Sequence, residues 1–365
     1  MTFTDEHRLL HDYAERLLRE QGPVSHLRAL RDNDDELGYD APLWQAMIDA
    51  GWTGLLVPER FGGLDFGYRG AGLIAEQIGR NLSLTPFLPT VVGAAVALSH
   101  GGTSAQQEWW LPRLAAGELL CALAIDEGAK HHQGPYRTLA QQDSQGWRLN
   151  GSKTLVLDGH IADLLLVAAQ TEHGAALFLV DPCAGGVTLE RTRMVDSRNA
   201  ALLTLDNAPA EPLADGAGAL QAALTGCRAV LAAELAGIAL GSFEITLAYL
   251  KERRQFERHI GSFQALQHRA AQWYADAHMS AALAQAALAA LDAGDADAQA
   301  LSCAAKAKAN QVARLAAAEA VQMHGGIGMT DEFDIGFYMK RARAAEESFG
   351  DTAFCLDRFA QLKQY

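Results

Sequence analysis

Cysteine is scarce in this chain of 365 residues. Its five cysteines are odd in number, widely spaced and without a CxxC pair: Cys121, Cys183, Cys227, Cys303 and Cys355. Such spacing is not that of a disulfide framework or of a cysteine-based zinc site. It predicts reduced, mostly buried thiols, as in a cytoplasmic protein.

Basic residues are the minority among the charges. The chain has 30 Lys and Arg against 44 Asp and Glu, which gives a formal net charge of −14. Surfaces for nucleic acid or for anionic membranes need clustered Lys and Arg, so we expect neither partner. An anionic cofactor is compatible with this charge, because a few arginines or a helix N-terminus can hold a phosphate.

Long apolar runs are also absent. No stretch approaches the roughly 20 apolar residues that span a bilayer, and the N-terminal residues lack the apolar core of a signal peptide. The hydrophobic share of 49% and the charged share of 20% are ordinary for a globular protein. The length allows two or three domains with a large buried core. We expect a cytoplasmic protein.

The pattern along the chain changes twice. Residues 1–117 show apolar residues at helical spacing, for example Leu10, Tyr13, Ala14 and Leu17. Residues 118–212 hold short runs punctuated by Gly, Asp, Asn and Pro, which are typical of a small antiparallel β domain. Residues 213–365 hold long Ala-rich helices suited to a bundle. We predict an α+β fold, mainly α, with an N-terminal helical domain, a middle antiparallel β domain and a C-terminal four-helix bundle.

Two motifs in the last block narrow the function. The first is LKERRQFERHIGSFQALQHR and the second is AVQMHGGIGMTDEF. They resemble the R-x-x-F-G-x-x-I-x-x-F-Q-x-x-Q-H and Q-x-x-G-G-x-G segments of acyl-CoA dehydrogenases. In the first block, LLVPERFGGLDFG, AEQIGRNLSLTPFLPT and WWLPRLAAGE resemble the N-terminal domain of the same family. The matches are in the family's order and span nearly the whole chain.

The resemblance implies α,β-dehydrogenation of an acyl-CoA thioester with FAD as cofactor and an electron-transfer flavoprotein as acceptor. A carboxylate removes the α proton while the β hydrogen leaves as hydride to the flavin. It also places an FAD site shared between subunits at six positions: Arg253, Phe256, Gln264, Gln322, Gly325 and Gly326.

Chemistry supports these positions. Arg253 offers a forked donor for a pyrophosphate, Phe256 can flank an aromatic ring, and Gln264 can bond polar groups of a nucleotide. Gly325 and Gly326 permit close backbone approach. Simpler interpretations exist: Arg253 as a solvated helix charge, and the two glycines as a helix stop.

The chain departs from the family where a catalytic base is expected. In the family's Glu-Gly-Thr segment this chain has Phe349 before Gly350, and the second base position, on the long helix, falls on Leu231. Neither side chain can take a proton. Glu234 lies three residues after Leu231, about 4.5 Å along the helix axis and about 60° around it. It is the candidate base, with a packing or interface carboxylate as the alternative.

The β domain departs as well. Where the family has Thr-Glu-Pro-Gly-x-Gly-Ser-Asp, this chain keeps only Asp126, Glu127 and Gly128 as a remnant. The next flavin-facing segment should carry a Trp, and here it reads SKTLVLDGHIAD. His131 and His132 are adjacent and cannot both face one site on regular structure, so no metal site is expected.

These departures resemble one branch of the family, the heterotetrameric acyl-CoA dehydrogenases of bacterial steroid side-chain degradation. In that branch one subunit keeps the base, and its homologous partner keeps the scaffold and the cofactor contacts but has lost the base. The resemblance implies that this chain is of the second kind. Two alternatives remain: a self-sufficient homotetramer that uses Glu234, and a structural paralogue that binds neither flavin nor substrate.

Overall fold

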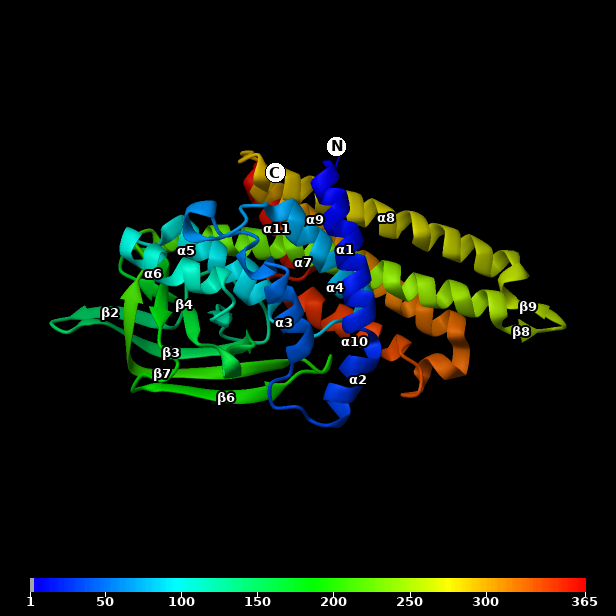
Figure 1. Ribbon diagram of the computed structural model, residues 1–365, viewed down its shortest axis with the longest axis horizontal. Helices are drawn as coiled ribbons and strands as arrows, with labels where there is room; N and C mark the ends of the chain where they lie inside the picture. The colour runs from blue at the N-terminus through cyan, green and yellow to red at the C-terminus, as the bar shows by residue number, and fades with distance from the viewer. Residues whose placement is uncertain (1–2) are drawn as a thin grey trace. The chain divides into compact units, whose positions relative to one another are not determined.

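The computed structural model describes residues 3–365 (Figure 1). Contacts between residues divide it into two compact units. Unit 1 contains the chain up to Arg28, Gly72–Ser83 and Arg228–Tyr365. Unit 2 contains Ala29–Ala71 and Leu84–Cys227.

Helices dominate the first and the last third of the chain. In chain order the N-terminal elements are α1 (Asp5–Gln21), α2 (Val24–Asp32), α3 (Ala41–Asp49), η1 (Trp52–Gly54), η2 (Glu59–Phe61), α4 (Tyr68–Asn81), η3 (Leu88–Ala94), α5 (Ala95–Gly101) and α6 (Ser104–Ala115). After the sheet follow α7 (Gly216–Glu252), β8 (Arg254–Gln255), β9 (Arg258–His259), η5 (Ile260–Ser262), α8 (Gln264–Asp292), α9 (Ala298–His324), η6 (Gly325–Met329), α10 (Ile335–Glu347) and α11 (Thr352–Lys363).

Unit 2 is built around a seven-stranded sheet. Its elements are β1 (Cys121–Ala124), β2 (Leu139–Asp143), β3 (Gly146–Leu157), η4 (Gly159–Ile161), β4 (Leu164–Thr171), β5 (Gly174–Val180), β6 (Val187–Arg193) and β7 (Asn199–Pro212). The strand order is β1-β4-β2-β3-β7-β5, with β6 also paired to β7 and β4 to β5. The predicted fold class is confirmed, because helices precede the strands of this sheet in the sequence and further helices follow them.

The sheet is mixed, whereas the sequence predicted an antiparallel one. β1 pairs in parallel with β4, from Cys121 opposite Leu164 to Ala124 opposite Val167. The reason is that the chain forms the antiparallel pair β2–β3 before β4 returns alongside β1 in the same direction. Alternating runs along a sequence show strands but not which distant strands become neighbours.

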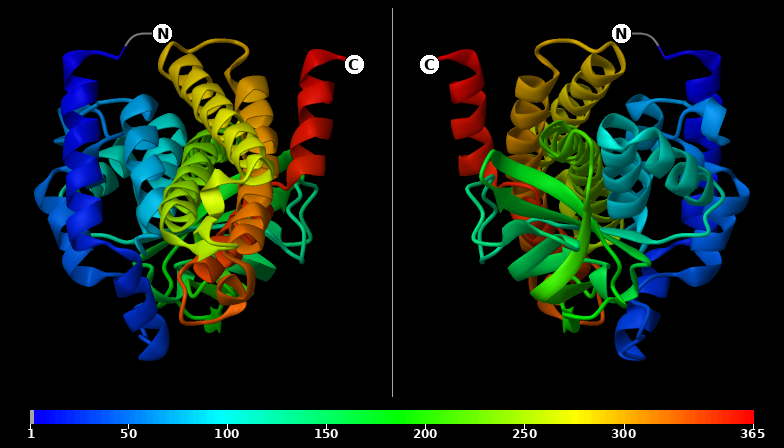
Figure 2. Two further views of the ribbon diagram at one scale, coloured as in Figure 1. Left: turned by 90° about the vertical axis from the view of Figure 1, so that its right-hand side faces the viewer. Right: turned by 90° about the vertical axis from the view of Figure 1, so that its left-hand side faces the viewer.

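Helices α5 and α6 lie over one side of this sheet (Figures 1 and 2). The π-helical turn η3 is tied to β1 through Thr90, whose hydroxyl accepts from the Cys121 N–H at 3.0 Å and donates to the Cys121 carbonyl at 3.1 Å. A methyl group added to Gly93 would lie 2.3 Å from Leu123, so helix and strand are in close contact there. The sheet's own core is apolar, with Leu149, Leu165 and Phe178 at its centre.

Unit 1 is a bundle of long helices. The described helices α7, α8 and α9 contain 37, 29 and 27 residues, and α7 belongs to this unit from Arg228 onward. Helix α8 runs beside α9 (Figures 1 and 2). The short helix α11 is an addition to the predicted four-helix bundle. It packs Cys355 against Cys303 of α9. By length and composition α7 could cross a membrane, but 78% of its most apolar window is buried, as in the core helix of a globular protein.

The backbones of α4 and α7 nearly touch where glycines face each other. A methyl group on Gly79 would lie 2.0 Å from the Glu234 carbonyl oxygen, and one on Gly237 would lie 2.0 Å from the Glu76 carbonyl oxygen. No other residue type fits such a crossing without moving a helix. These glycines therefore fix the distance between the two helices.

We predict that Gly237→Ala lowers the free energy of unfolding by about 2 kcal/mol, because the new methyl group must push α4 away. Gly336→Ala in α10 is the matched control, since a methyl group there meets nothing within 4 Å. It should raise stability by about 0.5–1 kcal/mol through its helix propensity. Urea unfolding monitored by circular dichroism measures both, and equal effects of the two substitutions would contradict the close crossing.

Candidate functional site

An aromatic cluster brings the two C-terminal motifs together in unit 1. The His324 ring, at the end of α9, lies 4.4 Å from the ring of Tyr249 near the end of α7 and 4.7 Å from Phe333. The Tyr249 hydroxyl also donates to the His324 carbonyl at 3.4 Å. Beside this cluster Met323 packs with Leu250 in a small apolar core. The segments that follow Tyr249 and precede Phe333 are thus held at the same end of the bundle.

The strands β8 and β9 form a hairpin at that end (Figure 1). Its turn consists of Phe256 and Glu257, with φ angles of 51° and 65°. Two residues with positive φ make a type I′ turn, which normally selects Asn and Gly. Bulky side chains in this conformation are strained, and such strain gathers at functional sites. Phe256 is 86% exposed at the tip.

All six predicted cofactor positions lie exposed in unit 1. Arg253 follows directly after α7, where its N–H donates to the Tyr249 carbonyl at 2.8 Å. The side chains of Arg253, Gln264 and Gln322 make no hydrogen bond or ion pair within residues 3–365. Exposed polar groups without partners are available to a ligand or to a second chain.

The structure shows that Gly325 is a helix stop and that the backbone at both glycines is uncovered, whereas the approach of a cofactor to them stays a prediction. Gly325 caps the C-terminus of α9 with a φ of 65°, so it is a helix stop. A methyl group added to Gly325 or Gly326 would meet nothing within 4 Å, so the backbone there faces open space. The cationic fork of Arg253, two free amides and an uncovered glycine backbone fit the pyrophosphate and nucleotide part of FAD. We call these six residues the half-site.

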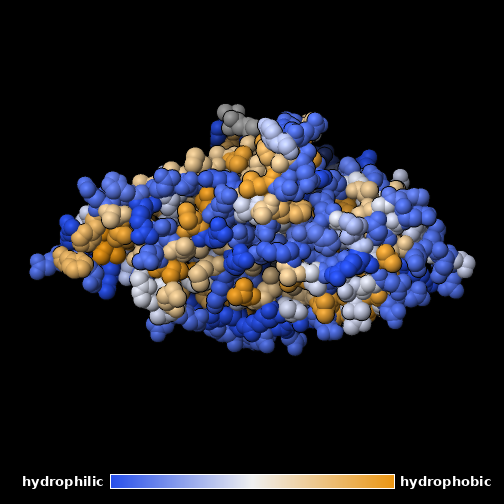
Figure 3. All heavy atoms as spheres, turned by 180° about the vertical axis from the view of Figure 1, so that it is seen from behind, coloured by the Kyte–Doolittle hydropathy of each residue, from blue (hydrophilic) through white to orange (hydrophobic). Residues whose placement is uncertain are grey.

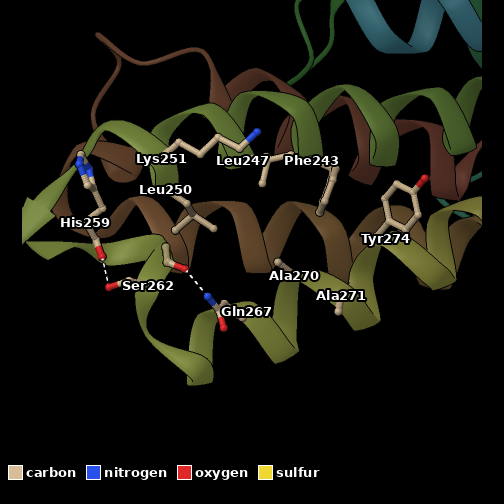
Figure 4. Close-up of a pocket in the computed structure, with 11 residues that line it drawn as sticks. Phe243, Leu247, Leu250, Lys251, His259, Ser262, Gln267, Ala270, Ala271 and Tyr274 are labelled. Carbon is tan, nitrogen blue, oxygen red and sulfur yellow. Dashed lines mark hydrogen bonds between the residues drawn. The ribbon is translucent and has the colours of Figure 1, made fainter.

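A pocket of about 630 Å³ lies next to the half-site (Figure 4). Phe243, Leu247 and Leu250 of α7 line it from one side, and Ala270 and Tyr274 of α8 line it from the other. Hydrophobic residues gather on the surface near the end that carries the hairpin, which is at the left in the view from behind (Figure 3). An apolar surface of this kind beside uncompensated polar groups is typical of a contact with another chain.

The two positions at which the resemblance leads us to expect a base, Leu231 and Phe349, carry no carboxylate. Leu231 is fully buried in α7, and Phe349 is 7% exposed. The residues one turn away from Leu231, Cys227 and Leu235, are buried and carry no carboxylate either. Within the described chain, Glu234 is the carboxylate that lies nearest to Leu231 along this helix.

The backbone around Phe349 is nevertheless held firmly. The guanidinium of Arg228 donates through Nε to the Phe349 carbonyl at 2.8 Å. The buried ammonium of Lys306 donates to the Ala345, Glu346 and Gly350 carbonyls at 3.0–3.2 Å. Burial lowers the pKa of Lys306 to about 8. Two buried basic side chains therefore hold the backbone of this loop in place.

Glu234 is bound to Arg341 in a buried ion pair. Its Oε1 accepts from Nε of Arg341 at 2.8 Å and from Nη2 at 2.7 Å. Both residues are 4% exposed. A carboxylate that neutralises a buried guanidinium is stabilised in its charged form and is a poor proton acceptor. Its role as a base remains a prediction, and its contacts favour a structural role.

Sequence reasoning missed the role of Glu127 in unit 2. Its carboxylate accepts from the Lys153 ammonium at 2.8 Å, from the Arg137 N–H at 2.6 Å and from the Thr138 N–H at 2.8 Å. Burial opposes its charge, but these hydrogen bonds lower the pKa of Glu127 to about 2. The signal in the sequence is Lys153, the lysine of the NGSK segment on β3. A lysine on a strand that becomes buried requires a carboxylate as its partner.

The two adjacent histidines face different partners. His131 Nδ1 is 2.7 Å from an Asp126 carboxylate oxygen, and the His132 ring meets the Tyr136 ring edge-to-face with the ring centroids 5.4 Å apart. They do not converge on a common point.

The buried ring of His324 should make the half-site sensitive to acid. Burial lowers the pKa of His324, while its hydrogen bond to the Ala320 carbonyl opposes this effect. The unfolded chain therefore binds the proton more readily, and stability falls as the pH drops below about 6.5.

We predict that His324→Phe, which keeps an aromatic ring in the cluster, loses less stability than the wild type between pH 7 and pH 5. The difference should be at most about 1.4 kcal/mol per pH unit. His173→Asn is the control, because this side chain is 87% exposed. Thermal unfolding at several pH values measures the effect, and parallel pH curves for wild type and His324→Phe would contradict it.

Comparison with known proteins covers nearly the whole chain. Three family models match in sequence order: the acyl-CoA dehydrogenase N-terminal domain over residues 4–118, the middle domain over 126–207 and the C-terminal domain over 214–361. Among curated relatives, acyl-CoA dehydrogenase FadE27 of Mycobacterium tuberculosis is 30% identical over 338 residues, which are 89% of each chain. Acyl-CoA dehydrogenase IpdE2 of the same organism is 30% identical over 95% of this chain and 94% of its own.

Two solved structures are similar over almost their full length. A variant of the Tcur3481-Tcur3483 steroid ACAD has a TM-score of 0.91 and 32% identity, covering 99% of this chain and 98% of its own. The ChsE4-ChsE5 complex from Mycobacterium tuberculosis has a TM-score of 0.91 and 27% identity, covering 100% and 98%.

Proposed function

Because this chain belongs to the acyl-CoA dehydrogenase family, we propose that it serves FAD-dependent α,β-dehydrogenation of an acyl-CoA thioester as a subunit without a catalytic base. A homologous chain would supply the base in a heterotetramer with two copies of each subunit. The substrate would be a CoA thioester of a steroid side chain. Support for these two points comes from relatives that are a steroid ACAD and a ChsE4-ChsE5 complex.

The half-site supports the cofactor. When bound, FAD supplies the acceptor for the hydride that leaves the β carbon. Arg253 would neutralise the pyrophosphate with two parallel N–H donors, and Gln264 and Gln322 would bond polar groups of the nucleotide. Gly325 and Gly326 leave the backbone uncovered beside them. Since all these groups face outward from unit 1, the cofactor they hold would be shared with a neighbouring chain.

The observation that carries the proposal is the ion pair between Glu234 and Arg341. Leu231 and Phe349 occupy the base positions that the resemblance gives, and neither carries a carboxylate. Glu234, the carboxylate nearest to Leu231 along α7, is already engaged by Arg341. The α proton of a thioester needs a positioned base to leave. A chain of this kind would therefore depend on its partner for the proton transfer, while it contributes scaffold and cofactor contacts.

Two rival functions remain distinguishable. A homotetramer that uses Glu234 would purify with flavin and oxidise acyl-CoA without a second gene product. A structural paralogue would lack flavin even when co-expressed with a homologous subunit. The proposed subunit would hold little flavin alone and become active only with its partner. Flavin content and subunit stoichiometry after co-expression decide among the three.

We further propose an electron-transfer flavoprotein as the electron acceptor and a cytoplasmic location. The location is supported by the free cysteines, four of which are buried.

We predict that Arg253→Ala removes at least nine-tenths of the flavin from the assembled complex, because the pyrophosphate loses its charged partner. Arg254→Ala is the matched control on the same hairpin. Its guanidinium donates to the Glu257 carbonyl at 3.1 Å within the hairpin itself. The ratio of visible to ultraviolet absorbance of the purified complex measures flavin content. Equal flavin content in both variants would count against the half-site.

We predict that Glu234→Gln keeps turnover in the co-expressed complex but destabilises the chain by about 3 kcal/mol, because it leaves Arg341 buried without its counter-charge. Replacing both partners, Glu234→Leu with Arg341→Met, should recover most of this loss. Stability is measured by urea unfolding and turnover by reduction of an artificial acceptor. Loss of turnover with flavin still bound would instead identify Glu234 as the base.

A further inference from the structure

The chain between α2 and α3 is a short acidic segment without regular structure (Figure 1). Residues 33–39 read NDDELGY, and we call them the strap. Its backbone takes the left-handed conformation at Asp34, with a φ of 48°, and at Gly38, with a φ of 71°. Within the strap, the Asp35 carboxylate accepts from the Gly38 N–H at 2.9 Å. A segment of this kind needs contacts outside itself to stay ordered against a sheet.

Ion pairs tie the strap to the end of β6. Asp34 Oδ1 accepts from Nη2 of Arg191 at 2.8 Å and from Nη1 of Arg193 at 3.1 Å. Arg193 also donates to the Arg31 carbonyl at 2.5 Å, just before the strap. The Asp34 side chain is 65% exposed, so water screens these ion pairs and each of them stabilises the strap only a little.

The imidazole of His160 in η4 makes the second contact. Its Nε2 lies 3.1 Å from the Glu36 carbonyl oxygen and 3.2 Å from the Leu37 carbonyl oxygen. Carbonyl oxygens only accept, so Nε2 carries the hydrogen and donates to both. In the neutral ring Nδ1 then has a lone pair and no hydrogen. This Nδ1 is buried and has no hydrogen-bond partner among residues 3–365.

The strap also packs closely on the start of β7. A methyl group added to Gly38 would lie 2.1 Å from Nδ2 of Asn199, whose side chain is buried. The Asn199 carbonyl accepts at 3.2 Å from the N–H of Asp158, the residue before η4. The strap, β7 and η4 therefore meet in one place.

A proton on Nδ1 is costly while the strap is closed, because it creates a buried donor without an acceptor. Burial accordingly lowers the pKa of His160, and the positive charge of Arg191 also lowers it, whereas the hydrogen bonds to the two carbonyls oppose this effect. In an open state the ring is in water and binds a proton at its ordinary pKa of about 6.5. The closed strap therefore loses stability relative to the open one as the pH falls below about 6.5.

Titratable groups surround His160 on the elements packed against it. They are Arg191 and Arg193 on β6, Asp158 and Asp163 on either side of η4, Cys121 on β1, and Asp34, Asp35, Glu36 and Tyr39 on the strap. Burial raises the pKa of Tyr39, and nearby aspartates raise it further. Burial also raises the pKa of the Cys121 thiol, to about 12. Both groups are therefore neutral at neutral and acidic pH, and the imidazole is the side chain suited to change charge between pH 5 and pH 8.

We propose that the strap is an acid-released latch. The neutral ring of His160 closes it on η4 and β6, and a proton on Nδ1 releases residues 33–39 and uncovers Arg191 and Arg193 at the end of β6. The latch lies entirely in unit 2. It goes beyond the proposed function, since it requires neither a flavin nor a partner chain.

Hydrogen exchange of the full chain, followed by mass spectrometry, tests the release. Protection factors, which are corrected for the effect of pH on the exchange chemistry, should fall about fivefold or more for residues 33–40 between pH 7 and pH 5. Peptides from β4, in the core of the same unit, are the internal reference and should stay protected at both pH values. An equal fall in β4 would mean that the whole unit unfolds, and it would overturn the latch.

His160→Gln tests the role of the ring. A glutamine amide can donate to the same two carbonyls but does not titrate. The protection factors of its strap should therefore stay within about twofold between pH 7 and pH 5. Asp34→Asn is the matched control, because it weakens the contact with β6 without touching the imidazole. It should lower the protection at both pH values and keep the difference between them.

Proteolysis gives a second readout that does not depend on exchange. Cleavage after Glu36 by a glutamate-specific protease is compared with cleavage of a free peptide of residues 31–42 at the same pH. The ratio should rise about fivefold or more from pH 7 to pH 5 in the wild type and stay constant in His160→Gln. Equal protection and equal cleavage of the wild-type strap at both pH values would overturn the latch. A pH difference that persists in His160→Gln would overturn the role of His160.

Discussion

The contact between Tyr249 and His324 is the interaction on which the half-site depends. It joins the end of α7 to the end of α9, and each of these ends leads directly into one of the two motifs. Ring contacts of this kind add only about 0.5–1.5 kcal/mol beyond the area they bury, but they fix orientation. Together with the packing of Met323 against Leu250, this contact holds the helix ends that precede Arg253 and follow Gln322 at the same end of the bundle.

Buried charges in this protein act as structural ties. Three contacts each fix a segment that would otherwise have unsatisfied polar groups: Glu234 with Arg341, Glu127 with Lys153, and Lys306 with carbonyls in and just after the last turn of α10. Such pairs add little net stability compared with apolar packing, but breaking one is expensive. They specify which elements meet. In this chain they fix the contact between α7 and α10, the loop between α10 and α11, and the contact of β3 with the segment after β1.

The sequence allowed the fold to be predicted because its signals are local. Helical spacing, turn residues and the two motifs each occupy a short stretch. The six half-site residues are exposed in the structure, and their role in binding FAD stays a prediction. The parallel pairing of β1 with β4 and the partners of Glu127 could not be predicted in the same way. They depend on residues far apart in the chain, and no periodicity records which distant group will neutralise a buried carboxylate. Glu234 shows the same limit, because its helix position was evident but its partner on α10 was not.

The outward-facing half-site has a thermodynamic consequence. A cofactor that bridges two polypeptides is bound more tightly when they are associated, and by linkage it strengthens their association by the same factor. Cofactor occupancy of such a protein then depends on the concentration of subunits as well as on that of the cofactor. In the proposed complex, dilution would release the cofactor and separate the subunits together, and a shortage of either subunit would lower the amount of bound cofactor.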